Sequence, residues 1–327
     1  MKAIVLTRIG GPEVLQVQDR PDPVPGDGDV LVRVEAFGLN HAETYFRSGK
    51  WPGAPEILGI ECAGTVVTDT TGGLAPGARV VAFMGGMGRT RNGAYAELVA
   101  VPAANTVPVE TSLSWTDLVA IPEVCATAWS GLRTLLGVVR GETVLVRGAT
   151  SAVGQAAVNV AADLGAAVIA TTRNPDRAPL LRELGASTVL IDDGDLAARV
   201  VERELRVDAV LDLVGNSALR DSLALVRPKG RVCQVGFLGG LAPVDGFNPA
   251  LDLPSGVQLS FFGSFVLGSP AFPVGDIPVQ ELVTRAEKGI FKAKPVRVFG
   301  FDEVATAHGL IEANRAGGKL AVSVRGR

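Results

Sequence analysis

The chain has 327 residues, of which 47% are hydrophobic and 20% charged, so it can bury a large core and divide into two domains. A formal net charge of -3, without any run of basic residues, argues against nucleic acid as a partner. Because no stretch of about 18 uncharged apolar residues occurs, we expect no membrane association and a cytoplasmic location.

The first third of the chain predicts an antiparallel β domain. Turn-rich stretches such as PDPVPGDGD (21–29) and DTTGGLAPG (69–77) separate short alternating segments such as VLVRVEAFG (30–38). The pattern changes at Ser114, which with Asp117 can form a helix N-cap, and a helical region is expected from there to residue 136.

The middle of the chain alternates between apolar strands and amphipathic helices. Expected strands are VLVRG (144–148), AVIATT (167–172), TVLID (188–192), AVLDLVG (209–215) and RVCQVGF (231–237), with helices at 152–164, 175–184, 195–204 and 217–226. Strands buried on both faces indicate a doubly wound parallel sheet covered by helices.

The C-terminal part predicts a helix near 278–288, a strand near residue 296, a helix near 302–314 and a last strand, KLAVSV (319–324). This segment is too small to fold alone, so we expect it to return to the first domain. The predicted domains are therefore residues 1–122 with 264–327, and residues 123–263.

The segment VLVRGATSAVG (144–154) has the layout of a dinucleotide-binding turn between a strand and a helix. The usual glycine positions fall on Ala149, Ser151 and Gly154, so only the last glycine is kept. An anion could still bind the N–H groups of Ser151, Ala152 and Val153 at the helix N-terminus, and the Ser151 hydroxyl could add a bond to a phosphate oxygen. By itself the segment could equally be a structural corner between a strand and a helix.

The tip of the next strand carries arginines where an NAD site would have an acid. Thr172 and Arg173 end the strand in ATTRNPDR, and Arg177 lies in the first turn of the following helix. A guanidinium here could bind a 2′-phosphate, which favours NADP(H) over NAD(H). The alternative is a pair of solvated arginines on a surface turn.

Several segments together resemble the medium-chain dehydrogenase/reductase superfamily, and within it the zinc-free, zeta-crystallin-like quinone oxidoreductases. They are GLNHAETYFRSG (38–49), LGIECAGTVV (58–67), NGAYAELVAVPA (92–103), the nucleotide loop and the ending NRAGGKLAVSV (314–324). The resemblance implies a GroES-like antiparallel β catalytic domain, which includes the returning C-terminal segment, and a Rossmann cofactor domain.

The resemblance also implies that this chain lacks catalytic zinc. Asn40 stands where zinc relatives have cysteine, Ile60 stands where they have the histidine of a GHE motif, and the third ligand position falls near Glu123. The residue inventory agrees, because two histidines and three dispersed cysteines cannot supply a three-ligand site. We therefore expect no metal.

Without zinc, hydrogen-bond donors must stabilise or protonate the oxygen of the substrate. The loop NHAETYFR offers Asn40, Tyr45 and Arg47. We expect Tyr45 or a water molecule to supply the proton, and Asn40 to orient the substrate or the cofactor ribose. A tyrosine that only packs through its ring remains the alternative. His41 is a possible cofactor contact, whereas His308 is expected to be structural.

Further cofactor contacts follow from family positions and from the carboxyl ends of the parallel strands. They are Thr127, Gly215, Asn216, Gly236, Phe237, Leu238, Asn314 and Lys319. The glycine-rich loop 84–88 and the segment SFFGSFVLGSPAF (260–272) suggest a pocket for a small, flat, apolar electrophile. In the family, the LSFFGSF segment pairs with its twofold mate, which implies a homodimer.

These observations predict NADPH-dependent reduction of a quinone or another conjugated carbonyl. One alternative is an enoyl reductase that acts on the C=C bond of a polyketide-type enone. An alternative of another class is a non-catalytic NADPH-binding sensor or RNA-binding protein, although the lack of a basic patch argues against RNA.

Overall fold

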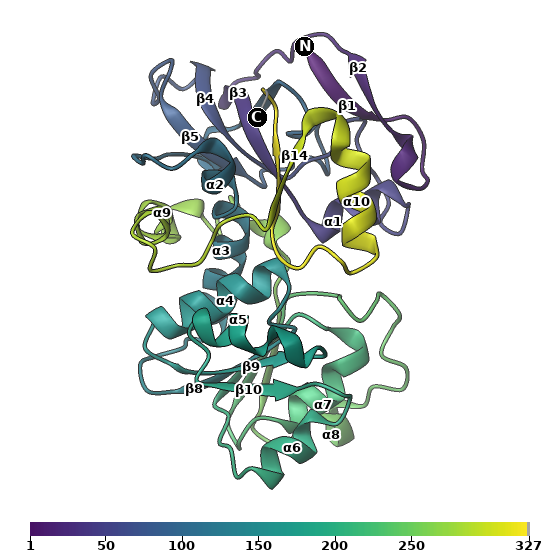
Figure 1. Ribbon diagram of the computed structural model, residues 1–327, viewed down its shortest axis with the longest axis vertical. Coiled ribbons are helices and arrows are strands. Elements are labelled where there is room, and N and C mark those ends of the chain that lie inside the picture. Colours follow the sequence, from purple (N-terminus) through teal and green to yellow (C-terminus); the bar gives the residue numbers. More distant parts are fainter. Residues whose placement is uncertain (326–327) are drawn as a thin grey trace. The chain divides into compact units, whose positions relative to one another are not determined.

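The computed structural model describes residues 1–325, and the chain forms two compact units (Figure 1). Unit 1 contains residues 1–123 and the C-terminal segment from Ser264, and unit 2 contains residues 124–263. The last two residues of the predicted first domain lie outside the described range.

Unit 1 is built on a mainly antiparallel sheet of short apolar strands, as predicted. Its strand order is β14-β15-β3-β4-β5-β7, β6 pairs with the other part of β3, and β1 and β2 form a separate pair. The strands are β1 Lys2–Leu6, β2 Leu15–Asp19, β3 Asp29–Leu39, β4 Glu61–Asp69, β5 Arg79–Phe83, β6 Leu98–Pro102, β7 Thr106–Pro108, β14 Arg297–Gly300 and β15 Leu320–Ser323.

The helices that accompany this sheet are short. They are α1 His41–Arg47, α2 Trp115–Val119, α9 Val279–Glu287 and α10 Val304–Glu312, and α3 Pro122–Trp129 leads into unit 2. The Ser114 hydroxyl accepts a hydrogen bond from Asp117 N at 3.1 Å, so the predicted N-cap is present. The single helical region expected after it is interrupted instead, because Pro122 has no N–H to continue α2. Residues 130–135 then form a π-helical segment.

The C-terminal segment returns to the sheet of unit 1. Strand β15 lies antiparallel to β3, with Leu320 opposite Leu39, and β14 lies parallel to β15. This register brings Lys319, just before β15, next to Asn40, just after β3.

Unit 2 is a parallel sheet with the order β10-β9-β8-β11-β12-β13. Its elements are β8 Thr143–Arg147, α4 Ala152–Asp163, β9 Ala167–Thr172, α5 Ala178–Glu183, β10 Thr188–Ile191, α6 Leu196–Glu202, β11 Ala209–Asp212, α7 Leu219–Ala224, β12 Arg231–Gln234, α8 Pro249–Asp252 and β13 Gln258–Phe261. In Figure 1, α4 and α5 lie on one side of the strands and α6 and α7 on the other. This is the doubly wound arrangement that right-handed crossovers produce, and it confirms the predicted fold class.

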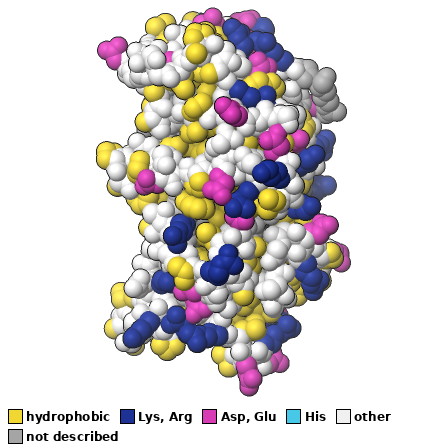
Figure 2. Space-filling model, turned by 90° about the vertical axis from the view of Figure 1, so that its left-hand side faces the viewer, with side chains coloured by type: hydrophobic (Ala, Val, Ile, Leu, Met, Phe, Trp, Pro, Cys, Tyr) yellow, Lys and Arg dark blue, Asp and Glu magenta, His cyan; other side chains and the backbone are white. Residues whose placement is uncertain are grey.

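Neither positive nor negative side chains dominate the face of the molecule that Figure 2 shows. Lys and Arg side chains are interspersed there with Asp and Glu, in keeping with the small net charge of -3. Among residues 1–325, no helix has both the length and the apolar character needed to cross a bilayer.

Candidate cofactor and catalytic sites

The turn between β8 and α4 combines one left-handed glycine with one tightly packed glycine. Gly148 adopts a φ of 78°, so the strained position falls on a glycine and not on Ala149. A Cβ on Gly154 would overlap the carbonyl oxygen of Gly148, so the helix packs closely on the turn. The retained glycine thus has the packing role that the sequence predicts for it.

Ser151 is the N-cap of α4. Its hydroxyl donates to Gly148 O at 2.9 Å and accepts from Gly154 N at 3.1 Å, so it holds the turn together. A bond from this hydroxyl to a phosphate would replace the one to Gly148 O, and the Ser151–phosphate contact stays a prediction. Ala152 and Val153 follow as the first helical residues, whose N–H groups have no acceptor within the helix. An anion such as a pyrophosphate fits this helix N-terminus.

The tip of β9 projects Arg173 into solvent. Thr172 is buried and its hydroxyl accepts a hydrogen bond from Asn174 N at 3.1 Å, which shapes the turn. Asn174 caps a 3-10 turn, Pro175–Arg177, that precedes α5, so the predicted helix begins with a tighter turn. Within the described residues Arg173 forms no ion pair, and its guanidinium is available to a phosphate.

The loops after β11 and β12 meet at the same edge of the sheet. Gly215 has a φ of 84°, and a Cβ there would overlap Gly236 O. Asn216 accepts a bond from Gln234 Nε2 at 2.9 Å and donates to Ala242 O at 2.8 Å.

The loops that follow β8, β11 and β12 bring several of the predicted residues of unit 2 close together. The Leu238 side chain lies against Gly148, and Gly148 N donates to Thr171 Oγ1 at 3.1 Å. The Phe237 and Phe261 rings are tilted by 49° to each other, with centroids 5.8 Å apart. Thr127 lies in α3 and is buried.

In unit 1 a buried polar cluster forms around Glu61. Its carboxylate contacts the Lys319 ammonium group and accepts bonds from Asn40 Nδ2 at 3.0 Å and Glu123 N at 3.2 Å. Lys319 Nζ also donates to Asn40 Oδ1 at 2.6 Å. Lys319 is 5% exposed and is the ion-pair partner of the buried Glu61 carboxylate, and its contact with the cofactor stays a prediction.

Glu43 completes this cluster. It lies three residues after Asn40, as in a capping box, and accepts bonds from Asn40 N and from Ile60 N, the latter at 3.2 Å. Burial raises the pKa of Glu43 to about 8, although the nearby Lys319 ammonium opposes this shift. The carboxyl group is therefore mostly protonated at neutral pH.

Arg47 and His308 belong to the interior of unit 1. His308 is held between Tyr95 OH at 3.0 Å and Arg47 Nε at 3.3 Å, and Arg47 also pairs with Glu312. Burial, followed by the adjacent Arg47 guanidinium, lowers the pKa of His308 to about 3, so the ring is neutral. His308 thus occupies the structural position expected of it, and Arg47 acts as a structural cation.

Tyr45 lies in an aromatic group on α1. Its ring centroid is 4.8 Å from that of His41 and 5.0 Å from that of Trp51, and the residue is 7% exposed. Burial raises the pKa of Tyr45, which keeps its hydroxyl protonated at neutral pH. Asn314, the remaining predicted contact in unit 1, is exposed and has a φ of 54°.

The two predicted pocket segments of unit 1 are joined by hydrogen bonds and a cation–π contact. Asn105 Nδ2 donates to Phe83 O at 3.1 Å and to Leu267 O at 3.0 Å, which links loop 84–88 to the segment after Ser264. The Arg89 guanidinium lies 3.9 Å from the centre of the Phe265 ring. A cation beside the predicted pocket was not expected from the sequence.

The side chains around Glu61 do not fit a catalytic zinc ion. Of the three positions that correspond to zinc ligands, Asn40 supplies an amide bonded to the Lys319 ammonium group, Ile60 supplies an aliphatic side chain, and Glu123 supplies a carboxylate that accepts a bond from Ser264 Oγ at 3.2 Å. No group of three or more His, Cys, Asp or Glu side chains that could hold a metal occurs among the described residues.

Sequence reasoning missed the buried charged residues Glu43, Arg147 and Asp212. Each carried a detectable signal: Glu43 follows an N-cap residue by three positions, and the other two end otherwise apolar strands. A charged residue at the carboxyl end of a buried strand needs a partner, which makes it a candidate for the site edge.

Two family models match the chain. An "Alcohol dehydrogenase GroES-like domain" covers residues 26–111, and a "Zinc-binding dehydrogenase" domain covers residues 152–277. A quinone oxidoreductase of Pseudomonas aeruginosa is 32% identical over 97% of this chain and 98% of its own length.

Two further relatives extend the comparison. The trans-enoyl reductase tndF of Aspergillus flavipes is 34% identical over 61% of this chain and 62% of its own. The structure of mycobacterial Rv1454c complexed with NADPH superposes with a TM-score of 0.87 at 30% identity, covering 99% of this chain and 100% of that one. The chain therefore belongs to the medium-chain dehydrogenase/reductase family of oxidoreductases, in the branch that contains the quinone oxidoreductases.

Proposed function

We propose that the protein uses NADPH to reduce a quinone or another conjugated carbonyl compound. The bound dinucleotide would supply a hydride to the electron-poor carbon of the substrate. The proposal depends mainly on the position of Arg173. This arginine is exposed, has no ion-pair partner in the described range, and lies at the strand tip where an NAD site would present an acid.

Residues of unit 2 would bind the cofactor. The N–H groups of Ala152 and Val153 would bind the pyrophosphate at the start of α4, where the helix dipole favours negative charge. Arg173, supported by Arg177, would form charge-assisted bonds to the 2′-phosphate. Gly215, Asn216 and the segment from Gly236 to Leu238 would line the nicotinamide end, since their loops converge on the same sheet edge.

Residues of unit 1 would handle the proton. Tyr45 would donate its hydroxyl proton to the oxygen that becomes negative during reduction, and burial keeps that proton in place at neutral pH. Asn40 is fixed by Glu61 and Lys319, so it would act by orientation and not by proton transfer.

An enoyl reductase activity is the second candidate, favoured by the trans-enoyl reductase among the relatives. Reduction of an enone and of a quinone both place a hydride on a carbon conjugated to a carbonyl, so the proposed residues would serve either reaction. The homodimer and the cytoplasmic location remain predictions.

A panel of quinones and enones, each assayed with NADPH and with NADH, tests the proposal. Oxidation of NADPH by quinones alone would support quinone reduction, and turnover of enones to saturated ketones would support the second candidate. Tight NADPH binding without turnover of any electrophile would instead indicate the non-catalytic sensor, and failure to bind either dinucleotide would overturn the proposal.

A further inference from the structure

Unit 2 contains a buried ionic cluster beneath the loops proposed to bind the cofactor. We define the Arg147 cluster as Arg147, Asp192, Asp212, Asp221 and Ser222. Arg147 ends β8 and lies beside Asp212, the last residue of β11, in the register of the sheet. Arg147 is 2% exposed, and Asp212 and Ser222 are fully buried. Charges in such surroundings are costly unless they are paired and hydrogen-bonded.

Every nitrogen of the Arg147 guanidinium has a partner. Nε and Nη2 donate to the two carboxylate oxygens of Asp192 at 2.8 and 3.0 Å. Nη1 lies 2.7 Å from Asp221 Oδ2 and donates to Ser222 Oγ at 3.0 Å and Ala218 O at 3.2 Å. The guanidinium therefore ties the end of β8 to the end of β10 and to α7.

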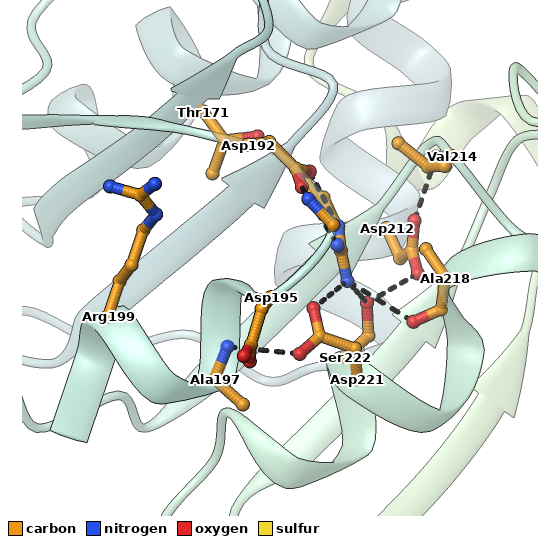
Figure 3. Close-up of polar contacts among 12 residues, drawn as sticks. Thr171, Asp192, Asp195, Ala197, Arg199, Asp212, Val214, Ala218, Asp221 and Ser222 are labelled. Atoms are coloured by element: carbon orange, nitrogen blue, oxygen red, sulfur yellow. Dashed lines mark hydrogen bonds and ion pairs between the residues drawn. The ribbon is translucent and has the colours of Figure 1, made fainter.

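Asp212 connects the cluster to the backbone of the next loop. Its Oδ2 accepts from Ser222 Oγ at 2.7 Å, and its Oδ1 accepts from Val214 N at 2.8 Å and Gly215 N at 2.9 Å. Figure 3 shows the carboxylates of Asp212 and Asp221 and the Ser222 hydroxyl converging, with Val214 on the other side of Asp212. One carboxylate thus joins the buried ions to two consecutive backbone N–H groups.

The loop that Asp212 holds has a conformation that the chain would not adopt freely. Gly215 has φ 84° and ψ -141°, a region open essentially to glycine only, and it packs against Gly236 O. The next residue, Asn216, is the one whose amide is bonded to Gln234 and Ala242. The two N–H bonds to Asp212 hold the backbone immediately before Asn216.

A purely stabilising role explains the composition of the cluster poorly. Three carboxylates surround one guanidinium, so the group carries excess negative charge when all are ionised. Well-packed apolar side chains are often at least as stabilising as buried ions. The cluster is instead suited to fixing backbone geometry, because it presents acceptors to particular N–H groups.

We propose that Asp212, held by Ser222 and Arg147, is a positioning residue that sets the loop 214–216 for dinucleotide binding. The inference rests on the proposed function, since it assumes that this loop contacts NADPH. It predicts a loss of cofactor affinity in variants whose fold is intact.

The test compares NADPH dissociation constants of the full-length protein and three variants, measured by fluorescence titration well below the unfolding temperature. Asp212→Asn keeps the shape but places an amide beside the Arg147 guanidinium and the Ser222 hydroxyl; we expect Kd to rise about tenfold. Ser222→Ala keeps Asp212 but removes its buried donor, and should raise Kd about threefold. If the Asp212 variant does not fold, the NADPH Kd of the Ser222 variant still tests the inference.

Asp193→Asn is the matched control, because it breaks a nearby ion pair to Arg199 in which the Asp193 side chain is 52% exposed. Figure 3 shows the Arg199 side chain lying apart from the converging carboxylates. This variant should bind NADPH like the wild type. In steady state, the Asp212 and Ser222 variants should raise KM for NADPH more than they lower kcat.

The outcomes separate the inference from the function on which it rests. Suppose that the wild type binds NADPH and that the folded Asp212 and Ser222 variants bind it with the same Kd, even if they unfold at a lower temperature. The cluster would then be merely structural, and the inference alone would be overturned. A wild-type protein that binds no NADPH would overturn the proposed function and the inference with it.

Discussion

At the scale of single residues, Arg173 should decide between the two dinucleotides. Replacing it with alanine removes a charge-assisted contact to the 2′-phosphate, which NADH lacks. We expect NADPH binding to weaken by about 1–3 kcal/mol while NADH binding changes little. Affinity measurements for both cofactors check this, with the exposed Arg182→Ala on α5 as the control. Equal losses for NADPH and NADH would rule out a role at the 2′-phosphate.

The two tyrosines of the chain form a matched pair for testing the proton donor. Tyr45→Phe removes the proposed donor, so kcat should fall on the order of 100-fold. Tyr95→Phe removes the bond to His308 and the hydrogen bond with Glu43, and should lower the free energy of unfolding by about 1–2 kcal/mol with kcat retained. An unchanged kcat in Tyr45→Phe would show that Tyr45 is not the proton donor and that its ring only packs against its neighbours.

Glu43 should make the stability of the protein depend on pH. Its pKa is raised by burial to about 8 in the folded chain, against an ordinary value of 4.5. The stabilisation from its protonated form is therefore complete below the ordinary pKa and is lost as pH rises through the folded value.

A comparison with Glu43→Gln isolates this contribution. Between these two pKa values, wild-type stability should fall relative to the variant by up to about 1.4 kcal/mol per pH unit. Urea unfolding of both proteins from pH 5 to pH 9 measures the difference. Parallel curves would show that Glu43 is ionised throughout the range.

At the scale of elements, the apolar pattern predicts five of the six strands of the parallel sheet and helices α4 to α7, whereas the segment of the edge strand β13 is singled out only through the family resemblance. The pattern could not predict how charged side chains pair. Arg147 and Asp192 are 45 positions apart in the sequence, and their contact depends on the strand order that brings β10 and β8 close. Lys319 shows the same limit, because only the β15–β3 register places it beside Asn40 and Glu61. Its family position, which predicts a cofactor contact, therefore gave no sign of the ion pair with Glu61.

The close packing of α4 on the end of β8 requires a residue without a Cβ at position 154. In Gly154→Ala the new methyl group would overlap Gly148 O, so the helix must move away from the turn. We expect a loss of about 1–3 kcal/mol in stability and weaker NADPH binding. Gly309→Ala in α10 is the control, because a Cβ there has no neighbour within 4 Å, and it should stabilise by about 0.5–1 kcal/mol. Thermal unfolding with and without NADPH measures both effects, and a Gly154 variant as stable as the wild type would contradict the packing argument.

At the scale of the whole molecule, β13 presents an open sheet edge. It is the outermost strand beyond β12, and within the described residues no further strand covers it. Leu259 is 38% exposed and Phe261 54% exposed on this strand. An uncovered apolar edge promotes association, and pairing with the same strand of a second copy around a twofold axis would close it.

We therefore expect a homodimer at micromolar concentration, detected by light scattering as twice the mass of one chain. Leu259→Lys should shift it to monomers, because the two symmetry-related lysines would lie near each other on one face of the continuous sheet and repel. Val201→Lys is the matched control: Val201 is 75% exposed on α6, away from this edge in sequence and sheet order, so its dimer should persist. A wild-type monomer would contradict the homodimer, and a dimer that persists in Leu259→Lys would place the interface elsewhere than β13.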